Sequence, residues 1–268
     1  MSISLSRQIK DRILRNYYSF RIKSTAEPNR LAFRHSPYKV LLILSHMRSG
    51  SSLLTHLLVD NPEIAGYGET HLCYSSEADF KELLLKVYWS IRGLRMDHTY
   101  VMDKILHNQR LPEIKILQSE FVKVIFLVRQ PTTTIASLLK LKSHWSWQNA
   151  IRYYSGRLEA LEMYAQSIND PQRSFFLTYN NLINQTEDTL QALQNFLGLQ
   201  MPLSENYQLT PKTGMKGIGD SSENIKAGKI LRRPQSSNFV LSEESSQVGT
   251  IVFERCCNIL SQCCQKID

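Results

Sequence analysis

The amino-acid sequence has no apolar run approaching the roughly 20 residues that a membrane-spanning helix requires. The hydrophobic region of a secretory signal peptide is missing too, because charged residues from Arg7 to Arg21 interrupt residues 1–23. Cysteine is scarce: there are 5, an odd number, and four of them lie near the C-terminus, which does not fit a secreted disulfide framework. These absences argue against a membrane-spanning or secreted protein, and we expect a cytoplasmic one.

A further absence concerns nucleotide binding. The Walker A pattern Gly-x-x-x-x-Gly-Lys-Ser/Thr does not occur, so a magnesium-bound nucleoside triphosphate is not the first expected ligand. Acidic residues are fewer than basic ones and the formal net charge is +8, but residues 1–36 alone hold eight Lys and Arg against two Asp and Glu. The rest of the chain is close to neutral, so its charge does not indicate a nucleic-acid partner.

The basic residues 1–36 form an N-terminal extension, and residues 37–268 fit a single α/β domain that can bury a full core. In the extension, Ile9, Ile13 and Tyr17 recur at helical spacing and predict an amphipathic helix. Two interpretations of this helix remain open. Its apolar stripe packs on the domain, which we favour, or the helix rests on an anionic membrane surface or on a partner.

The most informative stretch is residues 38–58, where an apolar run from Val40 to Leu44 lacks polar alternation. That pattern is typical of a parallel strand buried on both faces. A short turn rich in Ser and Gly follows and contains Arg48, and leucines at helical spacing from Leu53 onward predict a helix. Such a strand, turn and helix make a cradle for an anion, because small residues admit the ligand and backbone N–H groups point at it.

Two further predicted strands end on polar side chains. Residues 122–128 predict a buried strand that ends at Arg129, and Ser137 follows eight residues later on the next helix. Residues 175–177 predict a strand that ends at Thr178 and Tyr179. Together with helical spacing at residues 78–92, 147–168, 186–197 and 241–266, this predicts an α/β fold with a central parallel sheet flanked by helices. Because ligands bind at the carboxyl ends of parallel strands, the pattern favours a nucleotide with two separate anionic groups.

These residues resemble the sulfotransferases that use 3′-phosphoadenosine-5′-phosphosulfate (PAPS), in motif style the protein-tyrosine and Golgi-type branch. Residues 47–52 are similar to the family's Arg-Ser-Gly-Thr-Thr loop for the 5′-phosphosulfate, and residues 124–131 with Ser137 are similar to its 3′-phosphate site. Residues 177–182 resemble its Tyr-Glu-Asp-Leu segment, and residues 219–226 its cofactor-covering segment. The resemblance implies a P-loop-like fold and these cofactor-binding residues: Arg48, Ser49, Gly50, Ser51, Ser52, Arg129, Ser137, Tyr179, Ser222 and Lys226.

The resemblance also implies the catalytic residues. Glu69, 21 residues after Arg48, resembles the Glu before Thr in the family's Gly-Glu-Glu-Thr segment and would be the base, with His71 as its rival. Lys104, 25 residues before Arg129, resembles the family's Lys that steadies the transferring sulfonate, a role shared with Arg48. Since a sulfuryl group carries less charge than a phosphoryl group, fixed cations can stabilise it without Mg²⁺, and no metal is expected.

We therefore expect a sulfotransferase that moves a sulfuryl group from PAPS to an acceptor hydroxyl by in-line displacement and releases 3′,5′-ADP. Two alternatives remain: a P-loop-type nucleotide phosphotransferase, and a non-catalytic relative that binds a nucleotide or another anion. The sequence does not reveal the class of the hydroxyl-bearing acceptor. Residues 71–122 and the loop 199–234 are expected to line its pocket, with five candidate side chains: Tyr74, Trp89, His107, His144 and Trp145.

Overall fold

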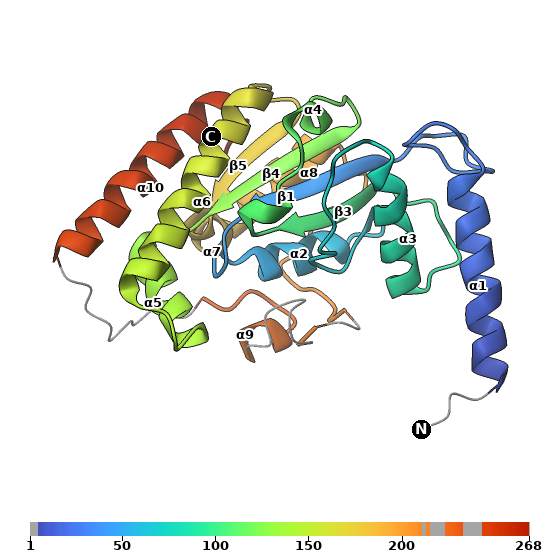
Figure 1. The fold of residues 1–268 in the computed structure, drawn as a ribbon, viewed down its shortest axis with the longest axis horizontal. Coiled ribbons are helices and arrows are strands. Elements are labelled where there is room, and N and C mark those ends of the chain that lie inside the picture. Colours follow the sequence, from blue (N-terminus) through green and yellow to red (C-terminus); the bar gives the residue numbers. More distant parts are fainter. Residues whose placement is uncertain (1–4, 211–212, 215–222, 233–242, 268) are drawn as a thin grey trace.

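A computed structural model describes residues 5–210, 213–214, 223–232 and 243–267 of the chain. Its centre is a five-stranded sheet with the order β2-β3-β1-β4-β5, and every neighbouring pair is parallel (Figure 1). The strands are β1 (Lys39–Ser45), β2 (Ile64–Ala65), β3 (Tyr100–Ile105), β4 (Val122–Val128) and β5 (Ser174–Thr178). Because the strands are parallel, the polar residues that follow β1, β3, β4 and β5 all meet at one edge of the sheet.

The central strand β1 is buried on both faces, which explains why its sequence shows no polar alternation. Val40, Leu42 and Leu44 belong to one hydrophobic cluster. Leu41 and Ile43 belong to another cluster on the opposite face. The sheet is therefore covered by helices on both sides, the three-layer α/β architecture that the sequence predicts.

The helices divide between these two clusters. The first cluster includes residues of α1 (Leu5–Lys23), α3 (Asp79–Ile91), α4 (Ile114–Leu117), α6 (Trp147–Ile168) and α10 (Glu243–Cys263). The second includes residues of α2 (Ser51–Val59), α7 (Tyr179–Asn184), α8 (Thr186–Leu197) and α9 (Glu223–Lys226). The helix α5 (Pro131–Leu141) packs with α6, and a short 3₁₀ turn, η1, spans Asn108–Arg110. In Figure 1, α6 and α10 lie side by side at one end of the sheet, and α1 and α3 at the other.

The sequence-based boundaries agree with most of these elements. Residues 122–128, 147–168 and 186–197 form the predicted strand and helices, and β1 and β5 are each one residue longer at both ends than predicted. The strand β3, from Tyr100 to Ile105, is not among the strands predicted above. Asp103 and Lys104 are buried inside this strand, so two charged side chains enter the sheet at a place where sequence patterning argues for a turn.

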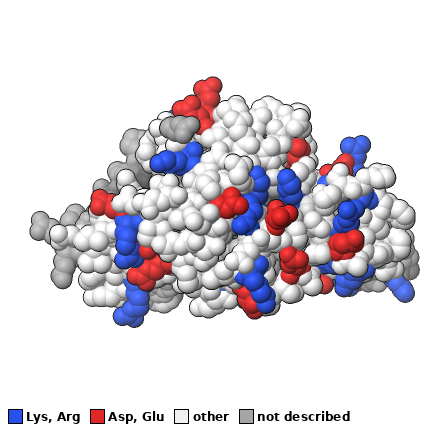
Figure 2. Space-filling view, turned by 90° about the horizontal axis from the view of Figure 1, so that it is seen from above, with Lys and Arg blue, Asp and Glu red and all other residues white. Residues whose placement is uncertain are grey.

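The N-terminal extension packs on the domain through α3. Tyr18 and Ile22 are buried in the first cluster, and the Tyr18 hydroxyl donates a hydrogen bond to the carbonyl oxygen of Gly93. Lys23 forms an ion pair with Glu82 at 3.6 Å. Figure 2 shows a face on which Lys and Arg are interspersed with Asp and Glu. None of the described helices has the length and apolar character that a bilayer span needs.

Candidate active site

The turn between β1 and α2 is held by hydrogen bonds among its own small side chains. The Ser45 hydroxyl lies 2.6 Å from both the Ser49 hydroxyl and the carbonyl oxygen of Leu127 in β4. The backbone N–H of Ser51 donates to the Ser49 hydroxyl at 3.2 Å. Ser49 is thus buried inside the turn and fixes its shape, whereas Arg48 and Ser52 are only half-buried at its rim.

A buried histidine links this turn to the end of β4. The Nε2 atom of His46 accepts a hydrogen bond from the Arg129 N–H at 3.0 Å, and its Nδ1 donates to the carbonyl oxygen of Met47 at 2.9 Å. Burial lowers the pKa of His46 from 6.5 to about 3, so the ring is neutral near pH 7. The local sequence does not predict this role of His46, because its hydrogen-bond partner Arg129 is 83 positions away in the chain.

Arg48, Arg129, Ser137 and Tyr179, predicted from three separate segments, meet in one place. The Arg48 Nε donates to the Ser137 hydroxyl at 2.8 Å, and an Nη of Arg129 donates to the Arg48 carbonyl oxygen at 3.0 Å. The Arg129 guanidinium also lies over the Tyr179 ring, 4.2 Å from its centroid. The two arginines therefore face the same side of the sheet edge, as a site for one ligand with two anionic groups requires.

Gly50 allows the close approach of these parts. It precedes α2 with a φ of 96°, in the left-handed region that favours glycine. A Cβ at this position would lie 2.3 Å from Cδ2 of Tyr179, far inside van der Waals contact. The residue is needed so that the Tyr179 ring can lie against the backbone at the positive N-terminal end of α2.

A third cation continues this row toward a carboxylate. Lys104 in β3 is buried, and its Nζ lies 3.2 Å from the Ser52 hydroxyl and 3.8 Å from Oε1 of Glu69. Burial raises the pKa of Glu69, and Lys104 opposes that rise. Ser52 and Arg48 belong to the same turn, which therefore contacts Lys104 at one end and Arg129 and Ser137 at the other.

Asp103 positions the segment that carries Glu69. Its carboxylate accepts hydrogen bonds from the Thr70 N–H and hydroxyl at 2.8 and 2.6 Å, and from the Tyr74 hydroxyl at 2.6 Å. Tyr74 is therefore committed to this buried network, and its prediction as a pocket-lining residue is wrong. The rival base His71 is exposed, has a φ of 58°, and its carbonyl oxygen accepts a hydrogen bond from Arg110.

Arg157 of α6 is a second residue that the sequence analysis missed. It is buried, and its guanidinium donates to the carbonyl oxygens of Ser45 and Ile105 and to Oδ1 of Asn108, at 2.6, 2.6 and 3.0 Å. Burial lowers its pKa to about 10. Arg157 therefore joins the carboxyl ends of β1 and β3. The sequence offers one local indication of its burial: Arg157 is three residues after Tyr154, so both lie on the same face of the helix.

A cavity of about 290 Å³ lies beside the turn. The Tyr153 hydroxyl accepts from the Met47 N–H at 2.8 Å and donates to the carbonyl oxygen of Leu106 at 2.9 Å, so the cavity wall is bonded to the turn and to the segment after β3. Burial raises the pKa of Tyr153 to about 12, and the negative charge of Glu69 adds to the rise. The lining residues are Met47, His107, Asn108, Gln109, Lys142, Trp145, Arg152, Tyr153 and Gly156.

Of the five predicted pocket residues, His107 and Trp145 line this cavity. Trp89 instead packs against Arg15 and Arg92, whose guanidinium carbons lie 5.2 and 5.0 Å from its ring centroid. Lys226, predicted to bind the cofactor, is exposed on α9. Ser222 lies outside the described residues.

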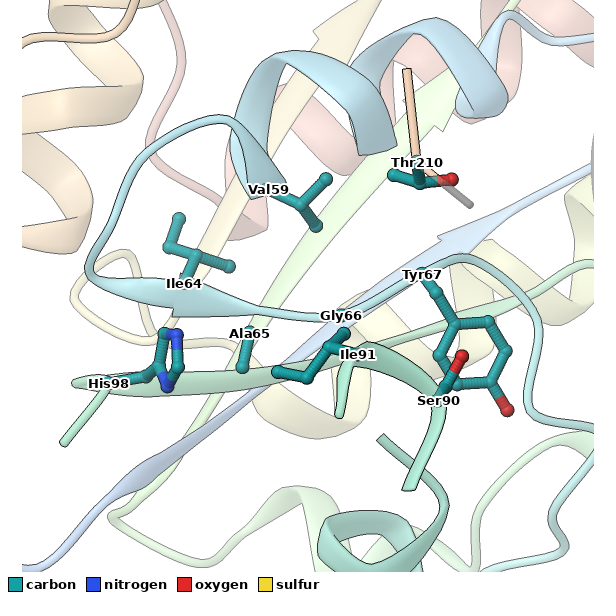
Figure 3. A pocket seen from close by; sticks show the side chains of 9 residues that line it. All are labelled: Val59, Ile64, Ala65, Gly66, Tyr67, Ser90, Ile91, His98 and Thr210. Atoms are coloured by element: carbon teal, nitrogen blue, oxygen red, sulfur yellow. The ribbon is translucent and has the colours of Figure 1, made fainter. Parts of the chain in front are cut away.

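Another cavity, of about 210 Å³, lies beyond the edge strand β2 (Figure 3). Its side chains come from the ends of α2 and α3 and from β2, and Val59, Ile64 and Ile91 make it mostly apolar. It is lined by neither Lys, Arg, Asp nor Glu, and burial lowers the pKa of its single histidine, His98. This cavity lacks the charge that the proposed nucleotide would need.

A family model described as "Sulfotransferase family" matches residues 87–203. A comparison with curated proteins finds no match. Among solved structures, the sulfotransferase domain from the Synechococcus PCC 7002 olefin synthase has a TM-score of 0.55 and 17% identity, covering 82% of this chain and 96% of its own. The sulfotransferase domain from the curacin biosynthetic pathway has a TM-score of 0.49 and 17% identity, covering 82% of this chain and 99% of its own.

The mouse sulfotransferase SULT7A1, solved in complex with PAP, has a TM-score of 0.42 and 16% identity, covering 69% of this chain and 63% of its own. The likeness to the Synechococcus domain, at 17% identity, shows a shared fold. The segment matched by the family model begins within α3 and contains Lys104, Arg129, Ser137 and Tyr179. Over this segment the chain is similar to a sulfotransferase family.

Proposed function

We propose that the protein transfers a sulfuryl group from PAPS to an acceptor hydroxyl. The observation that carries this proposal is that one turn contacts both groups of side chains: Arg48 contacts Arg129 and Ser137, and Ser52, four residues later, contacts Lys104. Lys104 in turn pairs with the Glu69 carboxylate. Cations supplied by three strand ends suit a ligand with separate phosphate groups, and a carboxylate at the end of the row suits an acceptor hydroxyl. The similarity of residues 87–203 to a sulfotransferase family supports the reaction class.

The residues at the strand ends fit the nucleotide. Arg129 and Ser137 would hold the 3′-phosphate, and the turn 47–52 the 5′-phosphosulfate, where the positive N-terminus of α2 adds its charge. Gly50 supports this fit, because only glycine leaves room for both the turn and the Tyr179 ring. Lys226, which is exposed on α9, would contact the nucleotide as well.

The reaction itself needs charge stabilisation and a base. When bound, PAPS supplies an activated sulfuryl group. Lys104 and Arg48 would stabilise the negative charge that develops on the sulfonate and the leaving phosphate, without Mg²⁺, and burial of Lys104 strengthens its effect. Glu69 would accept the proton of the acceptor hydroxyl, and Asp103 holds it in place through Thr70.

We place the acceptor in the cavity beside the turn. Lys142 and Arg152 contribute two cations to its lining, which includes no Asp or Glu, while Trp145 and Tyr153 contribute aromatic rings. This lining favours a ring-bearing acceptor with an anionic group of its own, because both features then find partners.

Isothermal titration of 3′,5′-ADP and a transfer assay with radiolabelled PAPS and pooled acceptors test the proposal. We expect 3′,5′-ADP to bind without Mg²⁺, and label to appear on a hydroxyl-bearing acceptor. A preference for Mg-ATP would instead favour a phosphotransferase. Binding of 3′,5′-ADP with no transfer to any acceptor would favour a non-catalytic relative.

A further inference from the structure

The N-terminal helix α1 carries an apolar stripe that its packing on the domain does not use. Ile9, Ile13 and Phe20 have exposed fractions of 53%, 64% and 52%. At the helical rotation of about 100° per residue, these three positions fall within roughly 40° of one another, so they form a single stripe along the helix. The buried residues Tyr18 and Ile22 lie on the opposite side of α1, where they fix it to the core. The stripe is therefore free of any role in holding α1 to the domain.

A fourth side chain extends this stripe from a different segment. Phe33 has an exposed fraction of 84%, and its ring centroid lies 5.9 Å from that of Phe20. Two hydrogen bonds hold the neighbouring Ala32 to Arg21 of α1: the Ala32 N–H donates to the Arg21 carbonyl oxygen at 2.8 Å, and Arg21 Nε donates to the Ala32 carbonyl oxygen at 2.7 Å. Phe33 itself has a φ of 59°, a strained value for a bulky residue. This backbone conformation exposes the Phe33 ring to solvent, where the ring does not contribute to the core. Strained backbone conformations of this kind are a feature of functional sites.

Basic side chains flank the stripe. Arg12 and Lys23 lie on one side of it and Lys10 on the other, each within about 80° of its centre on the helix, and all three are exposed. Across residues 1–36, eight Lys and Arg stand against two Asp and Glu, and one of those acids, Asp11, forms an ion pair with Arg92. Lys23 also pairs with Glu82 at 3.6 Å, so the flanks of the stripe are basic chiefly through Lys10 and Arg12.

The exposed apolar side chains of Ile9, Ile13, Phe20 and Phe33 together form what we call the apolar patch. We propose that this patch docks α1 on an anionic lipid surface. A narrow apolar stripe between two rows of cations is the pattern of a helix that lies in a membrane interface, where Lys and Arg stems reach up to the headgroups. Anionic headgroups provide the complementary charge. A protein partner is the less favoured occupant, because a narrow apolar stripe between basic side chains matches anionic headgroups above acyl chains.

The test is flotation of the full-length protein with two kinds of vesicle, phosphatidylcholine alone and phosphatidylcholine with phosphatidylserine. The double variant Ile13→Ser and Phe20→Ser removes half of the patch at exposed positions, so it should fold. A matched control is Ile251→Ser, at an exposed isoleucine (58%) on α10, at the far end of the molecule from α1 (Figure 1). A second variant, Lys10→Gln with Arg12→Gln, removes charge alone.

We expect the wild-type protein to float with the anionic vesicles, less so at high salt, and to bind neutral vesicles weakly. The patch variant should bind the anionic vesicles at least about tenfold more weakly, because each lost apolar side chain removes several buried CH₂ groups. The charge variant should lose affinity mainly at low salt, and the control should match wild type. Absence of vesicle binding, equal binding to neutral vesicles, or unchanged binding of the patch variant would each overturn the proposal. Self-association that the patch variant abolishes, without vesicle binding, would overturn it as well.

Discussion

Replacement of Glu69 by Gln tests the assignment of the base most directly. The glutamine amide has the size of the glutamate side chain but cannot take the proton from the hydroxyl of the sulfuryl acceptor. General-base catalysis contributes roughly 10²- to 10⁴-fold to a rate. We expect kcat to fall by about that factor. Because Glu69 pairs with Lys104, whereas the proposed nucleotide contacts are made by Arg129, Arg48 and Ser137, the affinity for 3′,5′-ADP should change little.

The measurement is single-turnover transfer from radiolabelled PAPS, paired with calorimetry of 3′,5′-ADP. His71→Gln is the matched control, because His71 is the rival base and is exposed two positions away. Its rate should remain near that of the wild type. A near-normal rate for Glu69→Gln, with a collapse for His71→Gln, would refute the assignment and move the base to His71.

The pH dependence gives an independent check on the same residue. Glu69 must be deprotonated to act, so the rate should rise with pH through its pKa, which burial places above the ordinary value of 4.5. Lys104 opposes this rise from 3.8 Å. The variant Lys104→Met removes that cation, so the acidic limb of the pH–rate profile should move to higher pH, whatever the loss in rate. An unmoved limb would show that Glu69 does not control it.

Other predictions follow from the surrounding contacts. Arg129→Ala should weaken 3′,5′-ADP binding roughly 10- to 100-fold in calorimetry, because it removes a charge-assisted contact worth about 1.5–3 kcal/mol, and unchanged affinity would defeat its role. Gly50→Ala should abolish that binding while circular dichroism stays native, since its Cβ would overlap the Tyr179 ring; wild-type affinity would contradict the cradle. Arg157→Met should lower the free energy of unfolding in urea by about 3 kcal/mol, because two buried carbonyl oxygens, of Ser45 and Ile105, lose their donor, and a loss below that of an exposed substitution would count against it. The depressed pKa of His46 means that the unfolded chain takes up a proton below pH 6.5 and the folded one does not until about pH 3. Stability should therefore fall by about 2 kcal/mol between pH 6.5 and about pH 5, and His46→Gln should flatten this slope.

Much of the fold could be predicted from local sequence. The strand at 122–128 and the helices at 147–168 and 186–197 have the predicted limits, because each combines a clear apolar period with a defined start and stop. The strand β3 could not be delimited in this way. Asp103 and Lys104 interrupt its apolar run, and both are tolerated in the sheet only because Thr70, Tyr74 and Ser52 supply polar partners from distant segments.

The same distinction applies to the site. Arg48, Arg129, Ser137 and Tyr179 could be found because each follows a recognisable strand, and the structure brings all four together. Glu69 could be found only through a motif resemblance, since nothing in its own surroundings in the sequence predicts proximity to Lys104. No local pattern revealed Asp103, which accepts hydrogen bonds from Thr70 and Tyr74.

The residues that the sequence could not reveal have one thing in common: they fix the strand ends to one another. Ser45 reaches β4 through Leu127 and His46 reaches it through Arg129, across 82 and 83 positions of the chain, while Arg157 contacts Ser45 from 112 positions away. Cations stabilise a developing charge efficiently only when they need not reorganise as it forms. In this protein that rigidity does not come from Arg48, Arg129 and Ser137, which are half-buried at the rim. It comes from buried partners behind them, so a substitution at Arg157 or His46 should reach the chemistry through the position of Arg48 and Arg129 without touching the ligand.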